Sequence, residues 1–417
     1  MVSFRLMEAL RRQGVDARML VCEKLTDSPY VSEVASNIDI KKSFILERLK
    51  IFVANGFNKK TLFKIDTGQN GLPLWNHPEV READAILLNW VNQGMLSLDG
   101  LEKILQLNKP VIWTMHDMWC MTGICHHAGT CVHFHNHCGN CPLLESKSSP
   151  KDLSYKVWEK KHEIYIQKDL TKKLVFVSVS NWLKNKSAES SLLKDKRVEV
   201  IPNAFPLDEE ENESGIKREV YTHSRRPIRI LFGAARLDDP IKGLDTLREA
   251  TGILKERYIG ENEDIELALF GNIKNPEAFE GFKLPLVKLG VLIGEKAVRQ
   301  AYENSDILVS ASSYETLPGT LVEAQAYGCI PVSFNQGGQA DIISNSDTGI
   351  ITEYSESLEM RAHNLAKGIQ QAIEIVKNSQ KHKEFQRSMR RNVIEKFSYN
   401  EVARKYISLI QSLEVKE

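Results

Sequence analysis

The sequence has no long hydrophobic run and no excess of charge of either sign. No apolar stretch approaches the ~20 residues that a membrane-spanning helix needs, and residues 1–14 lack the apolar core of a signal peptide. Lys plus Arg and Asp plus Glu both number 55, so the formal net charge is zero. This balance argues against nucleic acid as a partner, because nothing would gather it over the whole surface. We therefore expect a cytoplasmic protein in which any anion site is local.

Two features that are common in nucleotide-binding enzymes are also missing. No Asp-x-Asp metal motif follows a predicted strand, so we expect no catalytic divalent ion. Open α/β domains usually begin with a strand and a Gly-rich turn that leads into the first helix. Here residues 3–14 already have helical spacing. We expect either that the true start lies upstream of Met1 or that the first strand is missing.

Short, β-branched apolar runs alternate with segments of helical period. Such runs are typical of strands buried on both faces, and their alternation with helices indicates parallel α/β sheets with right-handed crossovers. At 417 residues the chain is also too long for one ordinary core. The runs are residues 85–91, 110–116, 173–180, 228–234, 265–271, 306–312 and 330–334.

One acidic, aliphatic-poor stretch, residues 206–227, has the composition of a linker or surface excursion. It divides the chain into two α/β domains, predicted at residues 1–205 and 228–395. Residues 396–417 have helical period, and we expect this last helix to pack back on the N-terminal domain.

Four charged residues stand where strands are predicted to end. Glu315 and Glu323 flank a Pro-Gly turn after one strand, and Arg236 and Lys242 follow another. Ligands of open α/β sheets bind outside the carboxyl ends of the strands, and two cations there could neutralise a departing pyrophosphate. The alternative is a loop carboxylate, a solvated helix glutamate and two surface cations. The combination favours a site for a nucleotide diphosphate.

The second half resembles the retaining nucleotide-sugar glycosyltransferases of the large family four. The segments that carry the resemblance occur in family order and spacing: GAARLDDPIKGLDTLREA, LALFG, LGVLIGEKAVRQAYENSDILVSASSYETLPGTLVEAQAYGCIPVSF and GGQADIISNSDTGIIT. The first half resembles the acceptor domain of bacterial polysaccharide-assembly members through ADAILLNWVNQGMLSLDGL, KPVIWTMHDMWCMTGICHHAGTCVHFHNHCGNCPLL and VSVSNWLKNKSAESSLLKDKRVEVIPNAF. The resemblance implies the GT-B fold, in which two Rossmann-like domains face each other across a cleft.

The resemblance also implies roles for single residues. Arg236 and Lys242 would hold the donor diphosphate, Glu315 would contact the transferred sugar and Glu323 the nucleotide ribose. The family usually has Phe-Gly where this chain has Leu317-Pro318, and Pro318 has no N–H to offer the donor. The donor-binding positions that match the family are Arg236, Lys242, Glu315, Gly319, Thr320, Leu321 and Glu323.

His116 would touch the donor sugar from the opposite wall and help to orient it, again by resemblance. The alternative is a histidine whose hydrogen bonds are satisfied within the core. Asn89 stands where many relatives have a histidine, and no role follows for it.

Transfer of a sugar with retention, from a UDP- or GDP-sugar to a saccharide or lipid-linked saccharide, is the function that the resemblance implies. The pathway would be assembly of a bacterial capsule, exopolysaccharide or lipopolysaccharide. Two alternatives stay open: another GT-B chemistry, such as nucleotide-sugar epimerisation or hydrolysis, and a non-catalytic sugar-binding or scaffold protein.

Four of the seven cysteines crowd into residues 125–141. Cys138 and Cys141 form a Cys-x-x-Cys pair, and Cys125 and Cys131 could complete a tetrahedral structural zinc site. Reduced thiols or local disulfides are the alternatives, since this spacing is not that of a standard finger.

Residues 41–64 interleave Lys and Arg with aromatic and aliphatic residues. A basic amphipathic stretch of this kind could make peripheral contact with the inner face of a membrane. The alternative is a helix whose apolar face lies on the core while its lysines face water.

Overall fold

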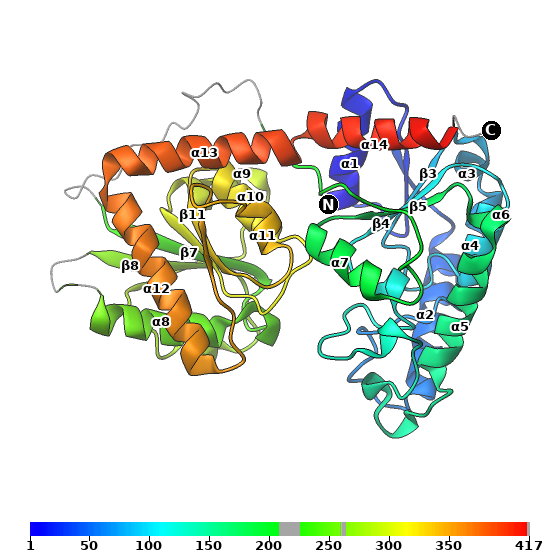
Figure 1. The fold of residues 1–417 in the computed structure, drawn as a ribbon, viewed down its shortest axis with the longest axis horizontal. Helices are drawn as coiled ribbons and strands as arrows, with labels where there is room; N and C mark the ends of the chain where they lie inside the picture. Colours follow the sequence, from blue (N-terminus) through cyan, green and yellow to red (C-terminus); the bar gives the residue numbers. More distant parts are fainter. Residues whose placement is uncertain (208–225, 259, 261–263, 415–417) are drawn as a thin grey trace. The chain divides into compact units, whose positions relative to one another are not determined.

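The protein, described here from a computed structural model, divides into two compact units. The structure describes residues 1–207, 226–258, 260 and 264–414, so most of the predicted linker at 206–227 lies outside the described residues. The N-terminal unit comprises Met1–Ala204 and Val402–Glu417, and the C-terminal unit comprises Phe205–Glu401. Figure 1 shows the chain coloured along the sequence.

The N-terminal unit contains a four-stranded parallel sheet of order β3-β4-β5-β6 and a separate parallel pair, β1-β2. Strands β4 and β5 are buried along their whole length, as their continuous apolar runs predict. The strands are β1 (Met19–Val21), β2 (Val31–Glu33), β3 (Ile86–Asn89), β4 (Val111–Met115), β5 (Leu174–Ser178) and β6 (Val198–Val200).

Helices of the N-terminal unit begin at polar caps in several cases. Ser36 caps α2, Ser97 caps α4, Asp152 caps α5 and Ser180 caps α7, each through a side-chain oxygen that accepts a backbone N–H of the first turn. The helices are α1 (Val2–Arg12), α2 (Asn37–Ala54), α3 (Pro78–Glu82), α4 (Leu98–Leu105), α5 (Leu153–Ile166), α6 (Lys168–Thr171) and α7 (Asn181–Glu189), with 3-10 turns η1 (Leu74–Asn76), η2 (Trp119–Met121), η3 (His133–His135) and η4 (Pro142–Lys147).

The C-terminal unit is built on a six-stranded parallel sheet of order β12-β11-β10-β7-β8-β9. Its first strand in the sequence, β7, therefore lies in the middle, between β8 and β10. The strands are β7 (Ile228–Arg236), β8 (Ile265–Asn272), β9 (Leu286–Gly290), β10 (Ile307–Ser310), β11 (Ile330–Phe334) and β12 (Ile350–Thr352).

Helices cover both faces of this six-stranded sheet, with α8 and α12 on one side and α9, α10 and α13 on the other (Figure 1). Together with the strands they form one apolar core that includes Phe232, Leu267, Val332 and Ile369. The helices are α8 (Leu244–Arg257), α9 (Glu295–Glu303), α10 (Gly319–Ala326), α11 (Gln339–Ile342), α12 (Leu358–Lys377) and α13 (Ser379–Phe397), with 3-10 turns η5 (Pro240–Lys242) and η6 (Pro276–Phe279).

The last helix, α14 (Tyr399–Glu414), contributes its residues from Val402 onward to the N-terminal unit. There the hydroxyl groups of Tyr406 and Thr114 are hydrogen-bonded over 2.8 Å.

The predicted fold class is confirmed, because both units are parallel α/β and every predicted run contains a strand. Among the described residues, no helix combines the length and the apolar character needed to span a membrane.

Candidate functional site

The candidate site of the C-terminal unit lies where its strand order reverses. Strands β7 and β10 are neighbours in the sheet although β8 and β9 come between them in the sequence. At such a switch point the loops that leave the two strands diverge to opposite faces, and ligands of open α/β sheets bind in the crevice between them. These two loops carry Arg236, Lys242 and Glu315.

Lys242 and Glu315 meet directly at this point. The Lys242 Nζ donates a hydrogen bond to Oε1 of Glu315 over 2.5 Å, and the Ser312 hydroxyl donates to the same oxygen over 3.1 Å. The side chains of Lys242 and Glu315 retain 29% and 24% of their exposure, so both stay within reach of a ligand. The loops themselves are joined by the Ser313 N–H, which donates to the Ile241 carbonyl over 2.9 Å.

Glycines allow these loops to approach one another. Gly243 has φ +71°, and a Cβ atom added to it would lie 2.2 Å from the Ala311 carbonyl oxygen. Gly337 has φ +96°, and a Cβ there would lie 2.3 Å from the carbonyl oxygen of Glu315. That same carbonyl accepts the Gly338 N–H over 2.8 Å. The backbone of Glu315 is thus held by a third loop, the one that leaves β11.

Arg236 ends β7 but pairs with a different carboxylate. Its Nε lies 3.3 Å from Oδ1 of Asp238, and its side chain is 40% exposed. Asp238 also accepts the backbone N–H groups of Lys274 and Asn275 through Oδ2. The two predicted cations are therefore held by separate carboxylates, Arg236 by Asp238 and Lys242 by Glu315.

Helix α10 carries the remaining predicted donor residues. It begins at Gly319 without a side-chain cap, and the Leu321 N–H bonds back to the Pro318 carbonyl over 3.1 Å, while Thr320 lies between them in the first turn. Uncapped N–H groups in a first turn favour an anion. Glu323 lies one turn further on. Its Oε2 accepts the hydroxyl of the buried Tyr302 over 3.1 Å.

In the N-terminal unit, His116 follows β4 and lies beside the last residue of β3. Because β3 and β4 are parallel neighbours that end at the same edge, His116 Nε2 reaches Asn89 Oδ1 at 3.0 Å. With Oδ1 as the acceptor, Nε2 carries the proton. Burial lowers the pKa of His116 to about 4. The imidazole is therefore neutral near pH 7, and its Nδ1 is an acceptor.

Beside His116 lies a network of buried charges. His126 Nδ1 lies 2.7 Å from Asp117 Oδ2 and its Nε2 lies 3.1 Å from Asp66 Oδ2, while Asp66 also pairs with Arg48. Burial would lower the pKa of His126, but the hydrogen bonds to Asp117 and Asp66 outweigh it and raise the pKa to about 9. Two carboxylates thus face two cations.

The network also fixes the loop in which His116 lies. Asp117 Oδ1 accepts the Trp119 N–H over 2.8 Å, and its Oδ2 accepts the Trp90 indole N–H over 3.0 Å. Burial would raise the pKa of Asp117, but the bond to His126 outweighs it, so the pKa lies below its ordinary value.

The zinc site that the spacing of the four clustered cysteines suggested stays a prediction. Within the described ranges, no group of three or more His, Cys, Asp or Glu side chains is placed to hold a metal ion, and every cysteine is a free thiol. Burial raises the pKa of Cys125 to about 12 and that of Cys138 to about 11. Cys138 Sγ instead accepts the Gly123 N–H over 3.1 Å.

Lys161 supports the start of this cysteine loop. Its fully buried ammonium donates to the carbonyls of Trp119, Thr122 and Gly123 over 2.6, 3.0 and 2.9 Å. It also lies 3.4 Å from the centre of the Trp119 ring.

In the basic stretch 41–64, helix α2 buries two charged residues and exposes two apolar ones. Its charged residues Glu47 and Arg48 are 0% and 6% exposed, whereas Ile45 and Leu49 are 60% and 51% exposed. Glu47 is buried because its carboxylate accepts the N–H groups of Thr67, Gly68 and Asn70. The alternative that placed the apolar face of this helix on the core is therefore wrong for Ile45 and Leu49.

Residues that the sequence analysis missed act as supports. Asn89 received no role but orients His116, and Ser312 received none but bonds to Glu315. Gly337 lies in a segment quoted only for the resemblance. The signal that could have found it is the Gly-Gly pair two residues after a predicted strand, because such a pair often marks a close backbone approach.

In a comparison with known proteins, a family model matches most of the C-terminal unit. Residues 217–392 match the family described as Glycosyl transferases group 1. A 41.2 kDa protein in the cps region of Klebsiella pneumoniae, itself uncharacterized, is 25% identical over 211 residues, 49% of this chain and 55% of that protein. A glycogen synthase of Pseudomonas fluorescens is 33% identical over 139 residues, 30% of this chain and 27% of that protein.

An Escherichia coli K12 protein that carries the provisional name colanic acid biosynthesis glycosyl transferase WcaC is 22% identical over 244 residues, 58% of this chain and 56% of that protein. The matches to these curated relatives span about half of their length or less.

Solved structures with the same fold include a glycosyltransferase from Rickettsia africae, with TM-score 0.62 and 16% identity over 100% of this chain and 95% of that one. The HepE protein of Anabaena in complex with UDP has TM-score 0.50 and 14% identity over 82% of each chain. Sequence identities this low establish the fold alone.

Proposed function

We propose that this chain, which has the GT-B fold and whose residues 217–392 match the group 1 glycosyl transferase family, transfers a sugar from a nucleotide-sugar donor to a saccharide acceptor. The observation that carries this proposal is the meeting of Lys242 and Glu315 at the switch point of the six-stranded sheet. An ammonium and a carboxylate side by side match the two parts of such a donor, the diphosphate and the sugar hydroxyls. The HepE complex with UDP is consistent with a uridine nucleotide, which we take as the first donor to test.

Lys242 and Arg236 assist the departure of the diphosphate in this proposal. As the bond between the anomeric carbon and the phosphate oxygen breaks, negative charge grows on the phosphate, and the two cations stabilise it. The acceptor hydroxyl forms the new bond on the face that is being vacated, and its proton passes to the departing phosphate oxygen. The configuration of the sugar is therefore retained, and no separate base is required.

Glu315 and Glu323 bind two other parts of the donor. Glu315 exchanges its bond to Lys242 for hydroxyls of the sugar, and Glu323 accepts hydroxyls of the ribose while Tyr302 keeps its carboxylate in place. The first turn of α10 offers the N–H groups of Gly319 and Thr320 to the phosphates. His116, neutral and oriented by Asn89, contributes hydrogen bonds that orient the donor sugar.

The acceptor is a saccharide intermediate of polysaccharide assembly. The relatives in the Klebsiella cps region and in colanic acid biosynthesis support this class over a free monosaccharide. A mature polymer such as glycogen is the second candidate, because glycogen synthases share up to 39% identity over a short segment of 70 residues.

A lipid-linked acceptor is supported by the exposed surface of α2 and by Phe57, which follows the helix. Ile45, Leu49 and Phe57 are 60%, 51% and 68% exposed, and lysines at 41, 42 and 50 lie on the same stretch. Exposed apolar side chains among lysines favour an anionic lipid surface. The double variant Ile45→Glu/Leu49→Glu should lose co-flotation with phosphatidylglycerol vesicles, while Met360→Glu on α12 keeps it. Equal flotation of all three proteins, or none with the unmodified chain, would remove membrane contact from the proposal.

Thermal shift with UDP, GDP and their glucose and mannose derivatives tests donor binding. A ligand at 100 times its Kd adds about 2.7 kcal/mol to folding stability and raises Tm. We expect one nucleotide series to raise Tm for the full chain and for Lys296→Ala, an exposed lysine on α9, but not for Lys242→Ala. If no nucleotide raises Tm, the scaffold alternative replaces the enzyme. NMR of the product then reads the anomeric configuration, and inversion would exclude the proposed stereochemistry.

A further inference from the structure

Trp90 is an exposed aromatic residue at the ligand-binding edge of the N-terminal sheet. It follows β3 directly, and 46% of it is exposed. Residues just beyond the carboxyl ends of parallel strands form the ligand sites of open α/β domains. Single exposed apolar side chains are ordinary on protein surfaces. The ring of Trp90 differs from them because it is fixed in place and lies beside carboxamide side chains.

The ring of Trp90 is fixed although it is exposed. Its indole N–H donates to Oδ2 of Asp117 over 3.0 Å, and Asp117 belongs to the buried network of charges. The ring also contacts His126, with 5.9 Å between the two ring centres and a tilt of 37°. Because these contacts restrict the side chain, little conformational entropy remains to be lost when a ligand stacks on the exposed ring.

The loop that follows Trp90 is held by bonds to other parts of the unit. The Gln93 N–H donates to Oδ1 of Asp66 over 3.1 Å, and the Gly94 carbonyl accepts the Ser43 hydroxyl over 2.7 Å. Gln93 has φ +57°, a conformation that few residues other than glycine adopt. Residues with such backbone strain persist where the surrounding structure holds them, and they cluster at ligand sites. The conformation of Gln93 therefore favours a binding role for this loop.

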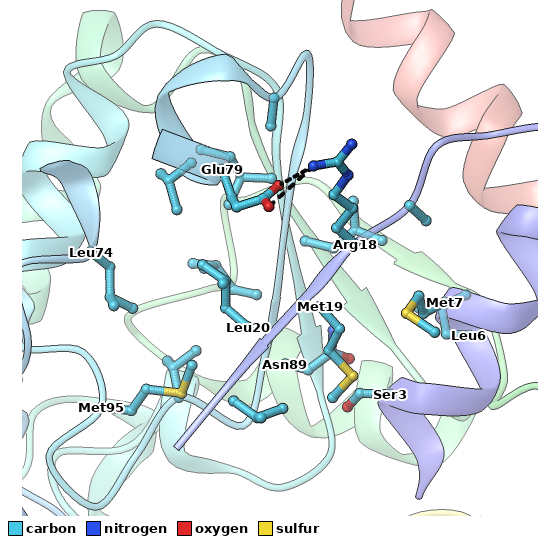
Figure 2. A pocket seen from close by; sticks show the side chains of 18 of the residues that line it. Ser3, Leu6, Met7, Arg18, Met19, Leu20, Leu74, Glu79, Asn89 and Met95 are labelled. Atoms are coloured by element: carbon cyan, nitrogen blue, oxygen red, sulfur yellow. Dashed lines mark hydrogen bonds and ion pairs between the residues drawn. The ribbon is translucent and has the colours of Figure 1, made fainter. Parts of the chain in front are cut away.

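Carboxamide side chains lie near the ring in the lining of a cavity of about 1270 Å³ in the N-terminal unit. They are Asn37, Asn89, Asn92 and Gln93, and Trp90 lines the same cavity. Figure 2 shows Asn89 there, together with apolar side chains from α1, β1 and η1. The Asn92 Nδ2 is buried and has no hydrogen-bond partner among the described residues. Such buried donors are rare in proteins, so this one favours a hydrogen-bonding occupant.

An aromatic face beside carboxamides matches the chemistry of a sugar ring. The face of an indole carries negative charge density and attracts the weakly positive C–H groups on one side of a pyranose. A sugar hydroxyl both donates and accepts hydrogen bonds, and a carboxamide does the same through its N–H groups and its carbonyl. An acyl chain at this place would leave the carboxamides without partners, which costs free energy.

We propose that Trp90 is the stacking platform for the acceptor saccharide and that Asn92 and Gln93 bind its hydroxyls. This inference rests on the proposed function and adds an acceptor subsite to it. Asn89, the residue before Trp90, bonds to His116, which the proposed function assigns to the donor sugar. The platform therefore lies beside the sugar that is transferred. Trp90 also selects among acceptors, because a hydroxyl directed at the indole separates the two rings.

Fluorine NMR of the full chain labelled with fluorotryptophan tests this inference. The chain has six tryptophans, and loss of one signal in Trp90→Phe assigns Trp90. The probes are the methyl glycosides of glucose, galactose, mannose and N-acetylglucosamine at millimolar concentrations, with glycerol as the polyol control. We expect at least one glycoside to shift the Trp90 signal until it saturates. Glycerol should leave that signal unchanged, and the signal of Trp75 in η1 should not move with any probe.

Transfer assays measure the contribution of the ring once a donor is identified. We expect Trp90→Ala to raise the KM for the acceptor by about tenfold or more and to change kcat by less than about twofold. Trp90→Phe keeps an aromatic face and should recover most of this loss, and Trp75→Phe is the matched control. Thermal shift with the nucleotide that binds the unmodified chain shows that Trp90→Ala keeps its fold and its donor site.

The outcomes separate this inference from the proposed function. If a nucleotide raises Tm but no glycoside shifts the Trp90 signal, the inference is overturned and the proposed function stands. If a glycoside shifts the signal but no nucleotide raises Tm, the saccharide site stands and the transfer fails. If phosphatidylglycerol vesicles shift the Trp90 signal and no glycoside does, Trp90 contacts lipid, and the acceptor subsite is overturned.

Discussion

In the N-terminal unit, His116 stands beside buried charges that hold its loop, whereas in the C-terminal unit Lys242 and Glu315 are brought together by loops whose backbones approach at glycines. The first arrangement depends on the protonation of His126 and on the balance of four buried charges. The second depends on the absence of Cβ atoms at Gly243 and Gly337. The same contrast runs through the sheets, since the C-terminal sheet is continuous and the N-terminal one is divided into β1-β2 and β3-β6.

This contrast teaches that the two units respond to different perturbations. Changes of pH or of a buried charge should act on the N-terminal unit, and backbone changes on the C-terminal unit. Substitutions confined to one unit can therefore separate the effect of the buried charges from the effect of the glycine loops.

Removal of one charge from the buried network should have the largest effect. Asp66 is 1% exposed and pairs with Arg48 and His126. Asp66→Asn leaves two buried cations with a single carboxylate, and breaking a buried pair costs about 3–5 kcal/mol. Urea unfolding should show this loss. Asp99→Asn is the control, because the Asp99 side chain is 75% exposed and its pair with Lys160 should contribute less than about 1 kcal/mol. Equal losses in the two variants would contradict the assignment.

Lys242→Ala should lower kcat by about 100- to 1000-fold once a donor is identified, because one group that stabilises developing charge is removed. Its stability should change little, since the ion pair with Glu315 is about a quarter exposed. Steady-state transfer assays with Lys296→Ala as the control measure this. A Lys242→Ala enzyme with unaltered kcat would exclude the leaving-group role.

The third prediction concerns pH in the N-terminal unit. The pKa of His126 is about 9 in the folded chain, above its ordinary value of 6.5, so the folded state holds a proton that the unfolded state releases between these values. The stabilisation is complete below pH 6.5 and is lost as pH rises through 9, by about 2 kcal/mol or more. The free energy of unfolding is measured for the unmodified chain and for His126→Gln at pH 6 and pH 9.5. Other groups titrate alike in both proteins, so the difference isolates the contribution of His126. An equal pH dependence in the two proteins would refute it.

Gly243→Ala should give the smallest of these effects, a destabilisation of about 1–3 kcal/mol, because the added Cβ meets the Ala311 carbonyl and φ is positive. Gly252→Ala is the matched control inside α8, where only Lys283 lies near, at 3.7 Å. That change should stabilise the protein by about 0.5–1 kcal/mol. Differential scanning calorimetry of both variants gives the comparison, and two shifts of the same sign would contradict it.

The sequence was sufficient for the long strands but not for the short ones. Runs such as Val111–Met115 and Ile330–Phe334 are buried throughout, so their composition alone identifies them. Strands β1 and β12 have three residues each and are only partly buried, so no apolar pattern marks them.

Pairings between distant residues were beyond sequence reasoning. Lys242 and Glu315 could be placed at strand ends, but their contact depends on β7 and β10 being neighbours, which only the sheet order fixes. Burial of Glu47 depends on N–H groups of residues 67–70, about twenty positions along the chain. Spacing within one helix therefore could not show that Glu47 is buried.

The ion pair between Lys242 and Glu315 has a consequence for the proposed transfer from a nucleotide-sugar. Before a donor arrives, the ammonium is already neutralised, so a simple anion such as inorganic phosphate has to compete with an attached carboxylate and gains little. A donor that supplies both phosphates and sugar hydroxyls replaces both partners of the pair. Once the sugar has left, Glu315 regains Lys242, and this exchange weakens the hold on the spent nucleotide and favours its release.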